Sequence, residues 1–117
     1  PGVMAPAVAA PAAIEPPYHY NEHVGDVAIA GWVFPREWQF RNTALLDVLF
    51  GLRNTMRVKG VFNTDQGWIF FISTRHETAV NSEVSRADNR LEIIAADALD
   101  WAALEAGLLA ARVAPAT

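Results

Sequence analysis

The stretch from Arg57 to Phe71, RVKGVFNTDQGWIFF, constrains the fold of this chain more than any other. Apolar residues alternate in its two halves, which flank a polar turn that ends in Gly67. Alternation with a period of two is typical of strands, and Asn, Asp and Gly favour the turn between them. We therefore predict a β-hairpin, with strands at 56–62 and 68–74 and a loop of about five residues.

Weaker patterns surround this hairpin. Alternating or apolar runs predict three more strands, and leucine-rich runs with apolar residues on one face predict two helices. The predicted strands are 26–34, 77–85 and 90–96, and the predicted helices are 41–54 and 101–113. This order predicts an α+β domain, an antiparallel sheet of four or five strands with both helices on one face. The nearest common template is the ferredoxin-like split β-α-β arrangement.

Composition limits the classes of protein to consider. The chain has 117 residues, of which 52% are hydrophobic, so it can form one domain with a real core. Its net charge of −4 argues against binding to a nucleic-acid backbone, which needs a basic surface. No apolar run reaches the roughly 20 residues of a membrane span. The absence of cysteine excludes disulfides and thiolate zinc sites.

The chain divides into two parts. Residues 1–24 are rich in Ala and Pro, which favour a flexible linker, and residues 25–117 carry all the patterns described above. The first residue is Pro1 and not Met. We therefore expect a piece of a longer chain or a processed product.

HYNEH is the one metal-ligand pattern, with His19 and His23 four residues apart and Glu22 between them. On a helix this spacing could bring two imidazoles to one zinc ion. Pro16 and Pro17 make a helix there unfavourable, so a solvated end of the linker is the favoured interpretation. Any zinc affinity is expected to be weak, because two imidazoles and one carboxylate would first have to become ordered.

Trp38 and Phe40 lie in PREWQF, between the first predicted strand and the first predicted helix. No periodic pattern assigns them to the core. They could form an exposed aromatic patch, which is typical of partner-binding surfaces.

Common catalytic motifs are absent from the sequence. It has no G-x-x-x-x-G-K-[ST] loop for phosphate, no G-x-G-x-x-G, no H-E-x-x-H and no G-x-S-x-G. We therefore expect no catalytic residues and no GTP binding by this chain itself.

From about Asp26 to Val113 the sequence resembles the C-terminal domain of the CobW-like P-loop GTPases. The resemblance rests on an ordered set of segments: GWVFPREWQF, a Leu-rich helix, R-x-K-G at Arg57, Lys59 and Gly60, GWIFF, and LEIIAADALDWAALEAGL. It implies a non-catalytic module of a GTP-dependent metallochaperone or cobalamin-synthesis accessory protein in the cytoplasm. GTP and a divalent metal such as zinc or cobalt would then belong to the parent protein. The implied partners are its N-terminal GTPase domain and a metalloprotein client.

Arg57 and Lys59 lie two residues apart, so a strand places both on one face. Burying two cations would cost too much, and they must therefore face water, a carboxylate or a partner. One interpretation is a solvated sheet face. The other is a contact surface for the GTPase domain or its client, formed with Gly60, Trp38 and Phe40. The alternative function is a stand-alone ferredoxin-like domain that binds a small ligand on its open sheet face, or a metal through His19, Glu22 and His23.

Overall fold

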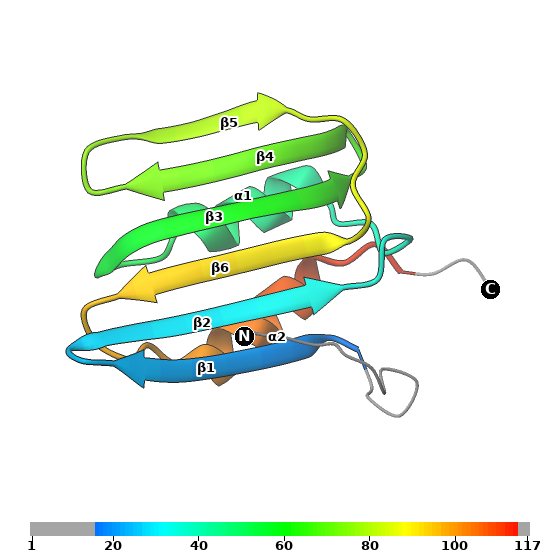
Figure 1. Ribbon diagram of the computed structural model, residues 1–117. Helices are drawn as coiled ribbons and strands as arrows, with labels where there is room; N and C mark the ends of the chain where they lie inside the picture. Colours follow the sequence, from blue (N-terminus) through cyan, green and yellow to red (C-terminus); the bar gives the residue numbers. More distant parts are fainter. Residues whose placement is uncertain (1–15, 115–117) are drawn as a thin grey trace.

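The computed structural model describes residues 16–114. Eight elements follow one another along this part of the chain: β1 (Tyr18–Val24), β2 (Val27–Phe34), α1 (Asn42–Phe50), β3 (Thr55–Thr64), β4 (Gly67–Thr74), β5 (Thr78–Ser82), β6 (Asn89–Ala95) and α2 (Trp101–Ala111). Figure 1 shows the strands side by side, with both helices behind them.

The strands form one six-stranded sheet in the order β1-β2-β6-β3-β4-β5, and every neighbouring pair is antiparallel. The predicted sheet of four or five strands is therefore wrong. The ferredoxin-like template is also wrong, because both helices of that fold connect two strands. Here α2 follows β6, and no further strand follows α2 within residues 16–114.

Strand β1 accounts for one difference from the prediction. We expected residues 1–24 to form a linker, yet every residue from Tyr18 to Val24 pairs with β2. The segment is largely exposed and polar because it is an edge strand, so it lacks the apolar alternation of a buried one. The compact part thus includes residues that precede the expected start at Gly25. Residues 1–15 of the predicted linker lie outside the described part.

The β3–β4 hairpin is tighter than predicted. Pairing continues to Thr64 and Gly67, so only Asp65 and Gln66 separate the two strands. Gly67 has a φ of 101°, a conformation that favours glycine. Thr64 stabilises the turn through its hydroxyl, which donates to the carbonyl of Gly67 and accepts from the amide of Gln66.

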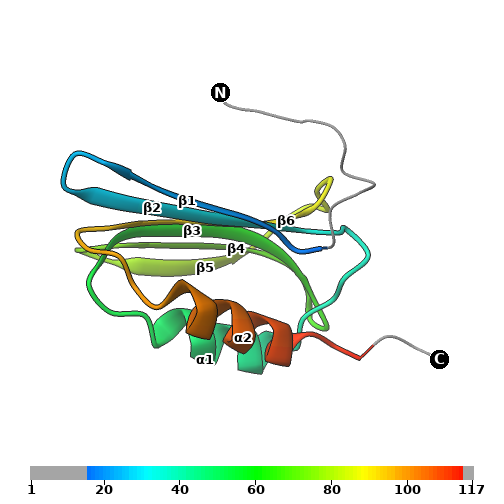
Figure 2. The same cartoon turned by 90° about the horizontal axis from the view of Figure 1, so that it is seen from below.

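Both helices pack on one face of the sheet, as Figure 2 shows. Alternate residues of the central strands point toward them and form the core, which includes Trp32, Phe34, Val58, Phe62, Phe71, Leu91 and Ile93. Leu45 and Leu49 of α1 and Leu104 and Leu108 of α2 complete it. The opposite face of the sheet carries no helix (Figure 2). Neither helix in the described part is long and apolar enough to cross a membrane.

Candidate functional site

The face of the sheet without helices, here called the open face, is organised in rows across the strands. Antiparallel register brings Gly31, Glu92, Lys59 and Ile72 side by side, with Tyr20 at the end of this row. The next row contains Val33, Arg90, Val61 and Phe70. Because strand side chains alternate between faces, both rows point away from the helices.

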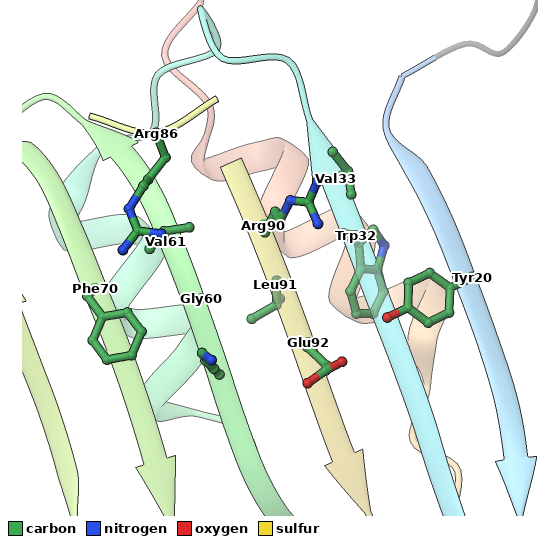
Figure 3. Close-up of a pocket in the computed structure, with 11 residues that line it drawn as sticks. Tyr20, Trp32, Val33, Gly60, Val61, Phe70, Arg86, Arg90, Leu91 and Glu92 are labelled. Carbon is green, nitrogen blue, oxygen red and sulfur yellow. The ribbon is translucent and has the colours of Figure 1, made fainter. Parts of the chain in front are cut away.

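A hollow of about 520 Å³ lies over these two rows (Figure 3). The loop 83–88 between β5 and β6 adds Arg86 at one end. The side chains and backbone around the hollow belong to Tyr20, Trp32, Val33, Lys59, Gly60, Val61, Phe70, Arg86, Arg90, Leu91 and Glu92. Three cations and the carboxylate of Glu92 thus line the hollow together with the apolar Val33 and Phe70. Such a mixture of charged and apolar groups can bind a carboxylate attached to an apolar group.

The cations of this face differ in their partners. Arg57 Nη2 donates to Glu92 Oε1 at 2.7 Å, and Arg90 Nε donates to Asp88 Oδ1 at 2.7 Å. Arg86 pairs with Glu83. Lys59 is exposed and forms no ion pair within residues 16–114. Of the predicted contact residues, Lys59 is therefore the cation that is free to bind a partner.

Tyr20 forms one wall of the hollow by lying across Gly31. A β-carbon at Gly31 would clash with Cε1 of the Tyr20 ring, so the ring occupies the space that glycine leaves. Burial, followed by the charges of Glu92 and Glu22, raises the pKa of Tyr20 above its ordinary value of 10.0. The phenol is therefore neutral at physiological pH and can donate a hydrogen bond.

Gly60 has a packing role that the sequence did not reveal. A β-carbon there would lie 2.6 Å from Cε2 of Phe62 and 2.9 Å from the carbonyl oxygen of Arg90. Phe62 is completely buried, so glycine is needed to make room for a core ring. Gly60 is buried and meets the hollow beside Lys59. The α-hydrogen of Gly60 that a side chain would replace faces the core, so only its backbone can contact a partner.

Trp38 and Phe40 do not form the exposed patch that we considered. Phe40 is completely buried and makes edge-to-face contacts with Phe34 and Phe62, at centroid distances of 5.2 and 5.6 Å. Trp38 is half-buried against the same core, and the guanidinium of Arg112 lies 3.6 Å from its ring centroid. Both aromatics therefore anchor the loop between β2 and α1 to the body of the domain.

The three predicted metal ligands are not brought together. They lie on a strand, where His19 and His23 share the face toward the helices and Glu22 occupies the open face. Residues four apart on a strand are separated by about 13 Å, too far for one zinc ion. Within the described residues, no cluster of three His, Asp or Glu side chains could hold a metal ion.

His19 instead belongs to an aromatic cluster. Its ring stacks on Trp32 with a centroid distance of 4.4 Å, and its Nδ1 lies 3.8 Å from Glu105 Oε1. Trp32 Nε1 donates to the same oxygen at 3.0 Å. This cluster ties β1 and β2 to α2.

Of the residues around the hollow, the sequence indicated only Lys59 and Gly60 as site residues. It did not indicate Tyr20, Trp32, Val33, Val61, Phe70, Arg86, Arg90, Leu91 and Glu92. Strand alternation could have placed Val61 and Phe70 on the open face. The position of β6 between β2 and β3 was the missing information, because it brings Arg90 and Glu92 beside Lys59.

No family model, curated protein or solved structure matches this chain.

Proposed function

We propose that this chain is a non-catalytic C-terminal module of a CobW-like, GTP-dependent metal-trafficking protein. In this proposal the open face of the sheet contacts the GTPase domain of the parent protein or a metalloprotein client in the cytoplasm. The sequence resemblance from about Asp26 to Val113 supports the choice of family. GTP and the transported zinc or cobalt ion would be held by the parent protein, because this chain contains no phosphate-binding motif.

One observation carries the contact role, the position of Lys59 at the hollow on the open face. A cation without a carboxylate partner contributes little to folding, so its placement there is explained better by a partner than by stability. The remainder of the face is partly apolar, as expected for a protein interface. Ile29, Trp68, Ile72 and Ile94 are all half-buried on it.

The experiment starts with the reading frame that encodes this chain. The proposal expects a P-loop followed by a Cys-rich segment upstream of it. That GTPase domain is then titrated into the chain in its GTP and GDP states, with calorimetry as the readout. We expect binding in at least one state, weakened by Lys59→Ala and unchanged by Arg75→Ala. Arg75 is exposed between β4 and β5 and forms no ion pair in the described part of the chain. An upstream region without a P-loop, or a GTPase domain that does not bind, would refute the proposal.

The second candidate is a stand-alone domain that binds a small ligand. The hollow favours it, because about 520 Å³ falls within the usual range of small-molecule sites, roughly 300–1,000 Å³. A reading frame that starts near Met4 would support this candidate.

A further inference from the structure

We infer that the hollow binds an acidic segment of a partner protein, whose carboxylate pairs with Lys59 while a neighbouring apolar side chain packs on Val61 and Phe70. This inference rests on the proposed function and adds the chemistry of the partner. It predicts an aspartate or glutamate next to a large apolar residue in that segment.

The positive charge of Lys59 favours a carboxylate as the group that binds in the hollow. Glu92 is the cross-strand neighbour of Lys59, but its Oε1 already accepts from Arg57 at 2.7 Å. Arg57 thus offsets the negative charge that would otherwise repel an incoming carboxylate. Lys59 retains three hydrogen-bond donors for the partner. Arg86 and Arg90 are already paired with carboxylates of this chain. They make the end of the hollow polar, but they are less available to a partner than Lys59.

The apolar residues of the hollow favour an apolar side chain next to the carboxylate of the partner. Val61 lies between Arg90 and Phe70 in its row, and Phe70 is half-buried with its ring on the open face (Figure 3). Val61 is only 9% exposed, so the half-buried ring of Phe70 supplies the apolar surface that a partner side chain would remove from water. The Tyr20 ring, held over Gly31, limits the hollow on the side of β1.

The extent of the face favours a protein segment over a small molecule. Half-buried apolar side chains continue beyond the hollow in two directions, toward Ile29 and Ile94 on one side and toward Trp68 and Ile72 on the other. A small ligand in the hollow would leave this surface uncovered. An extended segment that crosses the strands would cover it and place its acidic residue at Lys59.

Two capped peptides that differ in one charge test the inference. Acetyl-Leu-Asp-Phe-amide and acetyl-Leu-Asn-Phe-amide are titrated into the full ¹⁵N-labelled chain at low salt, and binding is followed through the amide signals of β3, β4 and β6. We expect the Asp peptide to bind about two- to fivefold more tightly, the range that an exposed ion pair provides. Added salt should reduce this preference.

Two variants of the chain test whether Lys59 causes the preference for the Asp peptide. In Lys59→Gln the two peptides should bind equally, and in Arg75→Gln the preference for Asp should persist. Equal binding of both peptides to the unmodified chain would overturn the inference, and so would a preference that survives Lys59→Gln. Phenylacetate supplies a ring and a carboxylate without a peptide backbone. If it binds as tightly as the Asp peptide, the occupant is a small anion and the inference is wrong.

The peptide titrations and the titration with the GTPase domain can fail independently of each other. If the GTPase domain binds the chain but the peptides show no dependence on Lys59, only the acidic-segment inference fails. If the peptides show that dependence and the GTPase domain does not bind, the parent protein was assigned wrongly, whereas the acidic specificity of the hollow stands.

Discussion

Arg57 donates a hydrogen bond from Nη2 to Oε1 of Glu92 across β3 and β6, at a distance of 2.7 Å. Lys59 lies opposite Glu92 in the register of the same two strands but is left without an ion pair in the described residues. Two cations that look equivalent in the sequence therefore differ in role. Arg57 stabilises the pairing of two strands, and Lys59 is available to a partner.

Replacing Lys59 should leave the fold intact. The side chain is exposed and makes no ion pair within residues 16–114, so Lys59→Ala should change the free energy of unfolding by less than about 0.5 kcal/mol. Urea denaturation followed by tryptophan fluorescence measures the change. A loss above about 1 kcal/mol would place Lys59 in a structural network instead.

Gly60→Ala should destabilise the domain. The added methyl group would lie 2.6 Å from the Phe62 ring and 2.9 Å from a backbone carbonyl, and overpacking of this kind costs about 1–3 kcal/mol. Gly107→Ala is the matched control, since its nearest neighbour would be Val48 Cγ2 at 3.4 Å. Gly107 lies inside α2, where alanine is favoured by roughly 0.5–1 kcal/mol. Equal effects of the two changes on thermal unfolding would contradict the packing role of Gly60.

Asn89→Ala should be among the most costly substitutions. The buried Asn89 amide donates to the carbonyls of Pro35 and Trp38 at 2.9 and 3.2 Å, and its Oδ1 accepts from the amide of Asn63 at 2.6 Å. Alanine would leave three backbone groups without these partners, at a cost of about 2–4 kcal/mol. The exposed Asn81→Ala on β5 is the control and should be nearly neutral in the same denaturation experiment.

Alkaline pH should weaken the fold through Tyr20. Because the pKa of Tyr20 is raised on folding, mainly by burial, the neutral phenol stabilises the folded state below pH 10.0. This stabilisation is lost as the pH rises through the folded pKa. Tyr20→Phe cannot ionise, so its free energy of unfolding should fall less steeply above pH 10.0 than that of the unmodified chain. Parallel curves for the two proteins would show that Tyr20 ionises without an effect on folding.

The parts of the fold that depend on local patterns could be predicted from the sequence. Expected strands at 26–34 and 68–74 coincide closely with β2 and β4, and the expected helix at 101–113 with α2. Asp100, a residue type that favours the N-cap, caps α2 through its Oδ1, which accepts from the amide of Ala103 at 2.9 Å. Short-range periodicity and capping carry this information.

The parts that depend on distant residues could not be predicted. The polar edge strand β1 is recognisable only once β2 is known to pair with it. Alternation placed Arg57 and Lys59 on one face, but Glu92, which distinguishes them, is 35 residues from Arg57 along the chain. Phe40 reaches the core through the path of a loop, for which no periodic pattern exists.

Amide chemical-shift mapping tests most directly whether the open face is the partner-binding surface. The ¹⁵N-labelled chain is titrated with the GTPase domain encoded upstream in its reading frame. We expect the largest shifts on Lys59, Val61, Phe70 and Glu92, and weaker binding in Lys59→Ala. Shifts confined to α1 and α2, on the opposite side of the sheet, would contradict this expectation.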